Sequence, residues 1–447
     1  MPEYTVTAAG PVPWQGRDSC RSVAVVGSGV AGLTAAHELT RRGALVTLYE
    51  ADDRLGGHAH TQDVHPGHGP ALALDTGFLV HNERTYPHLL RLFAELGVAT
   101  QESEMSMSVS CLGCGLEYAG ARGPGGLLAQ PRSLARGRYL RLLAEVPRFH
   151  RLARRLLAEP DGGDSGDGGT TLREFLRRGR FSRYFTAHFM TPLVASVWSC
   201  APGPALDYPA RYLFSFLDNH GMLTVTGSPR WRTVVGGSRT YVGRVAARLH
   251  AIHTGTPVVR VRRQRDGVTV ATADGRIDYF HGIVLATHPD QALRLLADPT
   301  PDERAVLGAF RYSWNPTVLH RDASVLPRAR RARASWNYRM ASCADRSDQV
   351  RVSYHLNRLL RLDTEEDYLV TLNEDPAAPV DPGRVISRTV YRHPLYTPES
   401  LAAQRRLPGL NRNRTAFAGA YHGWGFHEDG CRSGVQAAHS LHAAVTA

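Results

Sequence analysis

The chain has 447 residues, with 53 arginines, no lysine and a formal net charge of +12. A hydrophobic content of 43% and a charged content of 21% are ordinary for a soluble globular chain, and the length favours two or three domains or intertwined lobes. No apolar run approaches the ~20 residues that cross a bilayer, and residues 1–20 lack the pattern of a secretory signal. We therefore expect a cytoplasmic protein with a short flexible lead over residues 1–20.

The positive charge is spread along the chain, apart from one local cluster at Arg328, Arg330, Arg331 and Arg333. It fits a compositional bias with a solvated surface, and it leaves open a peripheral contact with an anionic membrane. No nucleic-acid-binding module is visible in the sequence, so nucleic acid is not an expected partner.

The six cysteines include one closely spaced pair, Cys111 and Cys114. A zinc site of the paired type needs a second such pair, which the sequence lacks, so no metal site is predicted. A redox role for this CxxC pair is one interpretation, and free thiols in a reducing cytoplasm are the other, which we prefer.

The first fifty residues predict a strand–helix–strand unit. The run Ser22–Val26 is apolar and ends at a glycine, as is typical of a buried parallel strand. Residues 29–42 have the apolar spacing of a helix and are followed by Gly43, a suitable C-cap. Residues 44–50 predict the second strand. This order is typical of the start of a dinucleotide-binding lobe.

The rest of the chain alternates between helical and strand-like patterns. Residues 133–198 are largely helical, with a polar, glycine-rich loop at 161–169. Further expected elements are a helix at 241–249, strands at 258–262, 268–271 and 283–286, strand-like stretches at 350–357 and 368–372, a strand at 415–418 and a helix at 433–445.

A GxGxxG motif, Gly27–Gly32, follows the first predicted strand and opens the first predicted helix. In this context the first glycine permits a tight turn, the second lets the backbone approach a pyrophosphate, and the third allows close helix–strand packing. The helix N-terminus adds free N–H groups. Glu50 lies 18 residues after Gly32, where an acid accepts hydrogen bonds from ribose hydroxyls.

A second glycine turn, DRLGGH at Asp53–His58, follows directly after Glu50. It brings further N–H donors and the Arg54 guanidinium toward the same pyrophosphate. This two-part site favours FAD over NAD.

With these motifs the chain resembles the glutathione-reductase-type FAD flavoproteins, in the branch that holds amine oxidases and phytoene-type desaturases. GSGVAGL, Glu50 and DRLGG look like its opening signature. Further matching segments are Gly236-Gly237 with Val258-Val259, the strand Ile283–Thr287 and the closing segment Phe417–Gly434. The resemblance implies that the backbone of Val259 meets the adenine and that the last helix points its N-terminus at the flavin pyrimidine ring.

A narrower resemblance rests on short motifs between Val23 and about Val445, namely GGHAHT, DTGFLVHN, SVWS, NHG, ATHPDQAL, SWNY and GFHEDG. They are similar to a bacterial family of predicted NAD/FAD-binding or amine-oxidase-like proteins. That family is commonly associated with cyclopropane-fatty-acid-synthase-like methyltransferases, and some relatives desaturate methylated fatty acyl chains. The resemblance implies an apolar substrate.

The resemblance implies an α/β fold with a glutathione-reductase-type, Rossmann-like FAD-binding lobe and a discontinuous, mixed α+β substrate lobe. The FAD-binding lobe is expected to combine residues 21–99, 232–292 and 412–447. The substrate lobe is expected to combine residues 100–231, which are largely helical, and 293–411. The residues expected to contact FAD are Gly27, Ser28, Gly29, Ala31, Gly32, Glu50, Ala51, Arg54, Gly56, Gly57, His58, Thr76, Gly77, Phe78, Val259, Thr287, Gly419, Phe426, Glu428 and Gly434.

The sequence departs from the family pattern in three places. A Gly-Asp or Gly-Glu pair usually lies near the ribityl chain, but here the pair is Gly419-Ala420, so the contact is expected from Glu428 or from main chain. His58 stands where many members have arginine. The lysine with which amine oxidases of this branch hold a water at flavin N5 has no counterpart, since the chain contains no lysine.

The substrate side is expected to be apolar and aromatic. A helical stripe runs from Phe181 to Trp198 and fits either a core face or a pocket for an apolar substrate. Candidate cavity residues on loops and glycine-rich segments are His220, Trp231, Trp336, Tyr338, Tyr421, Trp424 and His427.

Hydride removal from a C–H bond of a fatty-acyl or isoprenoid-like substrate, as desaturation or oxidation, is the first hypothesis. His427 and Tyr421 are the candidates for proton removal, and Glu428 for holding the ribityl chain or orienting His427. The alternatives are a flavin-dependent amine oxidase, a non-redox FAD-dependent double-bond isomerase, and a lipid-surface binding protein with a degenerate flavin fold.

Overall fold

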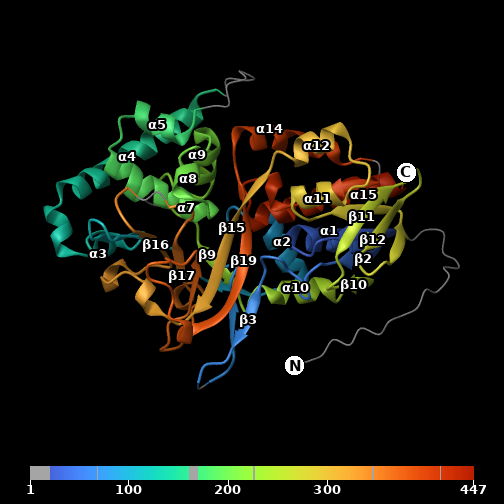
Figure 1. The fold of residues 1–447 in the computed structure, drawn as a ribbon, viewed down its shortest axis with the longest axis horizontal. Helices are drawn as coiled ribbons and strands as arrows, with labels where there is room; N and C mark the ends of the chain where they lie inside the picture. Colours follow the sequence, from blue (N-terminus) through green and yellow to red (C-terminus); the bar gives the residue numbers. More distant parts are fainter. Residues whose placement is uncertain are drawn as a thin grey trace.

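The computed structural model of the protein describes residues 21–67, 69–160, 170–224, 227–344, 347–412 and 414–446 (Figure 1). The expected lead at 1–20 and the expected loop at 161–169 lie outside these residues. Two lobes lie side by side in Figure 1, one built on a parallel sheet and the other on a mixed sheet with a group of helices.

A five-stranded parallel sheet supports the first lobe, in the order β10-β2-β1-β14-β20. Its strands come from the beginning, the middle and the end of the chain: β1 (Ser22–Val26), β2 (Leu45–Tyr49), β10 (Ala251–His253), β14 (Gly282–Leu285) and β20 (Thr415–Phe417). Alternate residues of β1 enter different cores, with Val23 and Val25 on one face and Ala24 and Val26 on the other. Burial on both faces explains the continuous apolar run, and the predicted α/β class is confirmed.

Helices α1 (Val30–Arg41) and α15 (His427–Thr446) pack against each other on one side of this sheet. The expected last helix was placed at 433–445, whereas α15 begins six residues earlier. Gly430 and Gly434 hide the start because glycine disfavours helices. Both lie at the contact with α1, where a Cβ on Gly434 would come within 2.4 Å of the Ala31 carbonyl oxygen.

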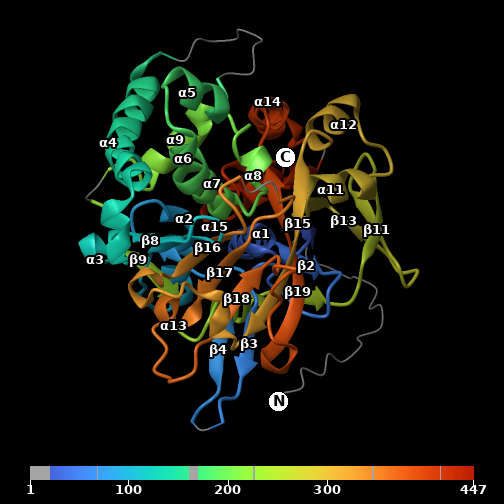
Figure 2. The ribbon, with the colours of Figure 1, turned by 60° about the vertical axis from the view of Figure 1, so that its left-hand side comes forward.

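The second lobe contains a seven-stranded mixed sheet in the order β19-β15-β18-β17-β16-β7-β8. Figures 1 and 2 show a group of helices at one end of it, above β16 and β17. The strands are β7 (Met107–Cys111), β8 (Leu116–Gly120), β15 (Arg311–His320), β16 (Trp336–Met340), β17 (Val352–His355), β18 (Leu369–Leu372) and β19 (Val385–Leu395). The helices are α4 (Gly137–Ala158), α5 (Leu172–Arg178), α6 (Arg183–Phe185), a π-helical turn (Thr186–Met190), α7 (Thr191–Trp198), α8 (Pro202–Ala205) and α9 (Ala210–Asn219).

The two longest strands of this sheet, β15 and β19, were not predicted. Each contains a proline, which argues against a strand when only the sequence is known. Pro394 lies on β19, an edge strand, and Pro316 lies one residue before β15 begins to pair with β18 at Thr317. Both prolines thus occupy positions where few ladder hydrogen bonds are lost.

Smaller elements complete the fold. They are the pair β3 (Thr61–Val64) and β4 (Leu72–Asp75), the sheet of β5 (His81–Asn82), β9 (Trp231–Val234) and β6 (Thr100–Glu102), the sheet of β11 (Val258–Arg263), β12 (Val268–Thr272) and β13 (Ile277–Phe280), and helices α2 (Pro87–Leu96), α3 (Gly123–Leu127), α10 (Arg239–Ala246), α11 (Pro289–Leu295), α12 (Pro301–Leu307), α13 (Leu356–Leu359) and α14 (Pro398–Arg406). Across the described part of the chain, no helix has the length and apolarity needed to span a bilayer.

We expect Gly434→Ala to destabilise the protein by about 1–3 kcal/mol, because the added methyl group would meet main chain of α1 that cannot move aside. Gly243→Ala is the matched control, since Gly243 lies in α10, is exposed and has nothing within 4 Å of its Cβ position. Thermal unfolding should show a lower Tm for the first variant and an equal or higher Tm for the second, because alanine favours helices. An unchanged Tm in Gly434→Ala would contradict the close packing of α1 and α15.

Candidate flavin site

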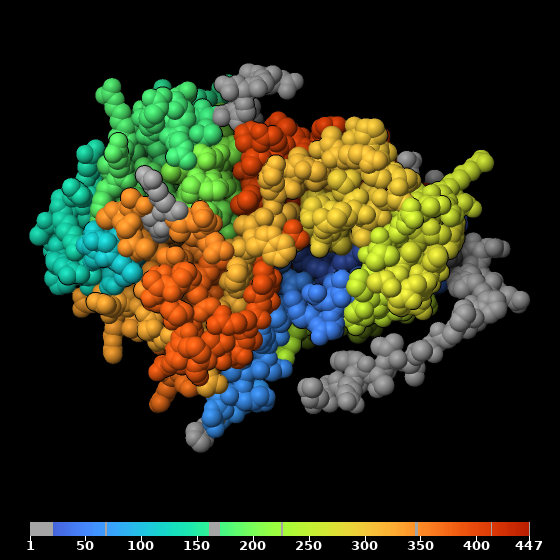
Figure 3. Space-filling view, in the orientation of Figure 1, coloured from blue at the N-terminus to red at the C-terminus, as the bar shows by residue number. Residues whose placement is uncertain are grey.

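One continuous cavity of about 1890 Å³ runs from the glycine-rich turn after β1 to the aromatic residues of the helical group. Its nucleotide end is lined by Gly27–Gly29, Glu50, Arg54 and Val258, among others. In the space-filling view, the blue N-terminal segment lies in a recess beside the yellow-orange segment that carries α11 (Figure 3). Residues of both segments, including Asp52 and Arg294, line this end of the cavity.

The first glycine turn is shaped by close main-chain contacts. Gly27 has φ +99°, and a Cβ there would lie 2.8 Å from the Ala286 carbonyl oxygen. A Cβ on Gly32 would lie 1.9 Å from the Gly27 carbonyl oxygen. Gly29 instead has open space where a Cβ would stand, and it lines the cavity. The turn therefore presents bare backbone and the N-terminus of α1 to a ligand, as a pyrophosphate requires.

A hydrogen-bond network joins this turn to the acid after β2. The Ser28 N–H and hydroxyl donate to Glu50 Oε2 at 2.8 and 2.5 Å, and the Asp52 N–H donates to Oε1 at 3.0 Å. A carboxylate offers about four acceptor positions, so one remains on Glu50 for a ribose hydroxyl. The Ser28 hydroxyl also accepts from the Gly56 N–H at 3.0 Å. Ser28, which belongs to the first glycine turn, thus also binds the second one.

The second glycine turn brings a cation to the cavity. Gly56 and Gly57 have φ of +109° and +56°, and Arg54 Nη1 donates to the Gly57 carbonyl at 2.9 Å. A Cβ on Gly77 would lie 2.3 Å from the His58 carbonyl oxygen. The segment Thr76–Phe78 therefore lies directly beside this turn and lines the same part of the cavity.

The cavity is lined by six histidines, all with lowered pKa values: His58, His150, His220, His288, His393 and His427. Burial is the main cause for each, and it lowers the pKa of His58 to about 4 and of His288 to about 3. Proximity to His58 lowers the pKa of His288 further, and proximity to His58 and His288 lowers that of His393. At neutral pH this wall of the cavity is therefore uncharged.

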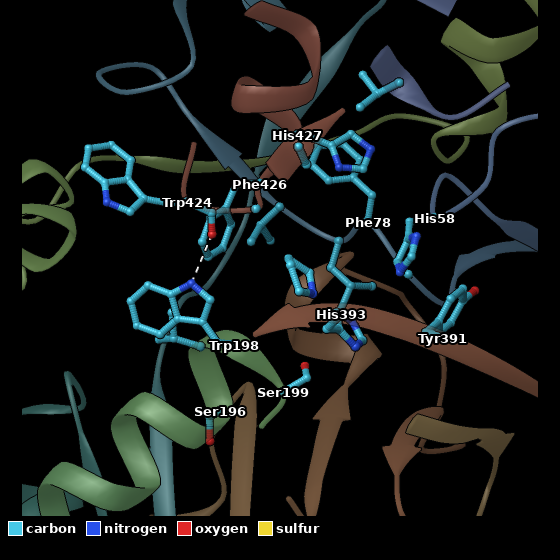
Figure 4. A pocket seen from close by; sticks show the side chains of 18 of the residues that line it. His58, Phe78, Ser196, Trp198, Ser199, Tyr391, His393, Trp424, Phe426 and His427 are labelled. Atoms are coloured by element: carbon cyan, nitrogen blue, oxygen red, sulfur yellow. Dashed lines mark hydrogen bonds between the residues drawn. The ribbon is translucent and has the colours of Figure 1, made fainter. Parts of the chain in front are cut away.

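The closing segment after β20 lines the cavity, and Figure 4 shows its Trp424 and Phe426 beside Trp198 and its His427 beside Phe78. The substrate lobe holds it through main-chain carbonyls. Trp198 Nε1 donates to the Trp424 carbonyl at 3.0 Å, and the Tyr212 hydroxyl donates to the Gly423 carbonyl at 2.8 Å. Gln404 donates to the carbonyls of Tyr421 and Gly423, both at 2.8 Å.

The two candidates for proton removal both line the cavity. The His427 ring stacks on Phe78 at 3.6 Å, and its Nε2 lies 3.3 Å from the Tyr241 hydroxyl. Burial holds the pKa of His427 well below its ordinary value of 6.5, which makes it a poor base. Burial raises the pKa of Tyr421, and its hydroxyl has no hydrogen-bond partner among the described residues. Tyr421 therefore keeps its proton and can donate it to a ligand.

Most of the residues expected to contact FAD line this cavity: Gly27, Ser28, Gly29, Ala31, Glu50, Ala51, Arg54, Gly56, Gly57, His58, Thr76, Gly77, Phe78, Thr287, Gly419 and Phe426. Gly32, Val259, Glu428 and Gly434 do not. The two glycines serve helix packing instead. Val259 is the unpaired residue at the bulge in β11, and its side chain is half exposed. Val258 lines the cavity instead.

The contacts of Glu428 differ from those expected at the ribityl chain or beside His427. Its Oε1 accepts from the His88 N–H at 3.1 Å and lies 2.7 Å from His88 Nδ1, and its Oε2 accepts from the Leu89 N–H at 3.0 Å. These are N–H groups of the first turn of α2, which have no partner within the helix. Glu428 therefore caps α2, and it is not among the residues that line the cavity.

Several lining residues were missed in the sequence, above all Tyr391, Arg392 and His393 of β19 and His288 before α11. The Tyr391 hydroxyl lies 2.7 Å from Thr76 Oγ1 and 3.0 Å from His60 Nδ1, so β19 closes over the second glycine turn. The β-branched residues and tyrosine of VISRTVY were the available signal for this strand.

The cavity fits FAD on three observations. The bare backbone at Gly29 and the free acceptor position on Glu50 suit a pyrophosphate and a ribose. Buried polar atoms that line it lack partners among the described residues, namely His58 Nε2, His288 Nδ1, Tyr421 Oη and Trp424 Nε1. Such atoms are costly unless a ligand or water satisfies them. The volume leaves further space toward the aromatic end.

The cavity histidines predict that the protein loses stability on mild acidification. Their folded-state pKa values lie below the ordinary 6.5, so the unfolded chain binds more protons as the pH falls from about 6.5 toward 4. Their contribution is therefore complete above pH 6.5 and declines through that window. Asp429, whose pKa burial raises to about 6, and Asp75, whose pKa burial also raises, act in the opposite sense, but they are fewer than the histidines. Urea unfolding at pH 7.5, 6.0 and 5.0 should show a falling midpoint, and a constant midpoint would contradict the burial of neutral histidines.

The cap on α2 predicts that Glu428→Ala lowers the free energy of unfolding by about 1–2 kcal/mol while the flavin content stays unchanged. Glu365→Ala, at an exposed position, is the control and should have no effect. Unfolding curves and the visible spectrum of the purified variants test both statements. Loss of flavin from a stable Glu428→Ala protein would restore a role for this carboxylate at the cofactor.

The chain is similar in sequence to two mycobacterial oxidases. It is 28% identical over 284 residues to the putative flavin-containing monoamine oxidase AofH of Mycobacterium tuberculosis, covering 62% of this chain and 59% of that protein. It is 26% identical over 306 residues to the coproporphyrinogen III oxidase of Mycobacterium leprae, covering 65% and 64%. The chain thus matches less than two thirds of the length of these relatives.

Solved structures that share the fold include two enzymes with different named activities. Putrescine oxidase bound to putrescine superimposes with a TM-score of 0.68 at 16% identity, covering 95% of this chain and 99% of that chain. A fatty acid isomerase from P. acnes that produces CLA gives a TM-score of 0.66 at 17% identity, covering 93% and 97%. The profile of the flavin containing amine oxidoreductases matches residues 30–320, well over half of the chain. The protein therefore belongs to this family of flavoproteins, whose cofactor is FAD.

Proposed function

We propose that the protein is an FAD-dependent oxidoreductase that removes a hydride from a C–H bond of a small apolar organic substrate, by desaturation or oxidation. The observation that carries this proposal is the continuity of one cavity from the glycine turns to an aromatic wall. When bound, FAD supplies the hydride acceptor. The residues that would hold it are the turn Gly27–Gly29, Glu50, Arg54 and Gly57.

The protein's own part is to bind the substrate and exclude water. The substrate end of the cavity is lined by Phe189, Leu193, Val197, Trp198, Phe216, Trp336, Tyr354, Trp424 and Phe426. Side chains of this kind fit an apolar molecule and contribute mainly through the surface that they remove from water. A fatty-acyl or isoprenoid-like chain meets this description.

The distribution of charge supports an apolar substrate over a cationic one. The carboxylates among the described lining residues are Glu50, Asp52 and Glu102. The first two lie at the nucleotide end, and Glu102 is exposed. An ammonium group at the aromatic end would therefore lose its hydration without a buried counter-charge.

A small amine is the second candidate substrate, and the names of the relatives and of putrescine oxidase favour it. Aromatic side chains also attract cations through their ring faces, so the wall itself does not reject an amine. The absence of lysine from the chain argues against the amine-oxidase mechanism that uses a lysine-held water.

The visible spectrum of the purified protein, before and after acid precipitation, tests the cofactor first. We expect two flavin bands and release of the colour into the supernatant, because no attachment residue is apparent. A colourless folded protein that cannot be reconstituted with FAD would contradict an oxidoreductase and favour the lipid-surface alternative.

Anaerobic mixing with unsaturated or saturated fatty acyl compounds and with simple amines then tests the substrate class. We expect bleaching of the flavin bands with an acyl substrate and none with amines. Bleaching by amines together with peroxide release in air would overturn the apolar assignment. A rearranged double bond with no electron acceptor consumed would instead establish the isomerase alternative.

His427→Asn tests the catalytic base. Because burial makes the His427 ring a poor base, we expect the rate of flavin reduction to fall less than about tenfold at full FAD content. A loss of about 100-fold or more with full FAD content would establish His427 as the base. Tyr421→Phe is the parallel variant, which removes only the unpartnered hydroxyl.

A further inference from the structure

Four side chains that are separated in the sequence converge outside the flavin cavity. Cys111 ends β7, Cys114 lies in the β7–β8 turn, His188 lies in the π-helical turn, and Cys343 follows β16. Their ligand atoms all lie within 4.8 Å of one another. We propose that these three cysteines and one histidine bind a single Zn²⁺ ion in a closed, structural site.

The spacing of the ligand atoms fits a tetrahedral zinc ion. Cys111 Sγ and Cys343 Sγ lie 3.9 Å apart, and Cys114 Sγ and His188 Nε2 lie 3.6 Å apart. Around Zn²⁺, bond lengths of ~2.3 Å to sulfur and ~2.05 Å to nitrogen place two sulfurs ~3.8 Å apart and a sulfur and a nitrogen ~3.6 Å apart. A disulfide would bring its sulfurs to ~2.05 Å. The arrangement is therefore preformed for a metal ion and not for a disulfide.

The β7–β8 turn has the backbone form that a pair of metal-binding cysteines needs. Gly115 has φ +65°, and its N–H donates to the Cys111 carbonyl at 2.8 Å. The main chain of Cys114 and of Leu116 hydrogen-bonds to the sulfurs of Cys111 and Cys114, respectively. Such bonds orient both sulfurs toward one point.

A glycine in the same turn admits the third cysteine. A Cβ on Gly113 would lie 2.9 Å from the Cα of Ser342, so only glycine lets the turn approach the segment that carries Cys343. This contact places Cys343 opposite Cys111, although the two residues are 232 positions apart.

The histidine is oriented as a zinc ligand requires. His188 is fully buried, and its Nδ1 lies 3.1 Å from the Tyr184 carbonyl oxygen. Donation from Nδ1–H to that carbonyl leaves the lone pair on Nε2, the atom that faces Cys114. The Tyr184 ring stacks on the imidazole at 3.9 Å and holds its plane. A π-helical turn, common at functional sites, exposes Nε2 in this direction.

The surroundings suit the charge of the complex. Three thiolates and one Zn²⁺ ion carry a net charge of −1, and binding releases the three thiol protons to solvent. Arg132 Nη2 donates to the Gly115 carbonyl at 3.1 Å, and Arg136 has a buried Nη1 without a partner among the described residues. A soft set of three sulfurs and one imidazole selects zinc over magnesium or calcium, and four protein ligands leave no open position for catalysis.

The site would fasten three parts of the substrate wall together. His188 directly precedes Phe189, which lines the cavity, and the Tyr118 hydroxyl donates to the His188 carbonyl at 2.7 Å. Tyr118 and Val109 line the cavity from the two strands that the β7–β8 turn joins. Metal loss should therefore loosen the aromatic end of the cavity and leave the nucleotide end intact.

Elemental analysis of the purified full-length protein tests the site directly. We expect about one zinc per chain in the wild type and in Cys200→Ala, which removes a buried thiol outside the cluster. Cys114→Ser and His188→Gln should each retain less than a tenth of that zinc. These measurements need no flavin and no substrate, so they stand apart from the proposed function.

Cobalt substitution and thiol counting cover the case in which the variants do not fold. The wild-type protein with Co²⁺ in place of zinc should show the intense red-region bands of a tetrahedral, sulfur-rich site, and a thiol-specific mercurial should release one metal ion per chain. Absence of zinc and of the cobalt bands from folded wild-type protein would overturn the proposal. Zinc that persists in both cluster variants, or four free thiols instead of six in unreduced, denatured protein, would also overturn it.

Discussion

The close approach of main chain at the first glycine turn fixes the geometry of the whole nucleotide lobe. There is no room for a side-chain carbon between Gly32 and the Gly27 carbonyl, so α1 starts in contact with the end of β1. The Ser28 side chain then links three segments, because it donates to Glu50 and accepts from Gly56. Each segment would expose unsatisfied polar groups without the others, so the turn, the acid and the second glycine loop form as one unit.

The same constraint reaches the end of the chain through α1. Because Gly434 lets α15 lie against the backbone of α1, the N-terminus of α15 is carried to the cavity beside the N-terminus of α1. Two helix N-termini then face one ligand site, and both favour negative charge. Burial keeps the histidines of the cavity uncharged. The attraction for a pyrophosphate therefore comes from backbone dipoles and Arg54, and not from the protein's net charge of +12.

Local chemistry made much of the nucleotide end predictable from the sequence. The turn at Gly27–Gly32, the acid Glu50 and the second glycine loop are contiguous motifs whose roles depend on the backbone that they themselves form. Glu428 could not be assigned in this way, because its partner is the first turn of α2, some 340 residues earlier. Strand β19 was hidden by its proline, and the cysteine and histidine cluster was hidden because its four members lie on three unconnected segments. Where a role depends on long-range contacts, residue type alone does not determine it.

The π-helical turn shows how closely the two sites of the substrate lobe are joined. A π-turn rotates successive side chains differently from an α-helix, so His188 turns toward the cysteines while Phe189 turns into the cavity. The free-energy cost of that irregular turn is confined to a few residues, and a metal ion bound to His188 would offset this cost. The glycine turns can then set the geometry of the nucleotide end, while the metal site fixes the aromatic end of the cavity independently. Such a separation lets one family retain FAD and change substrate, because no residue of the β7–β8 turn contributes to the nucleotide end.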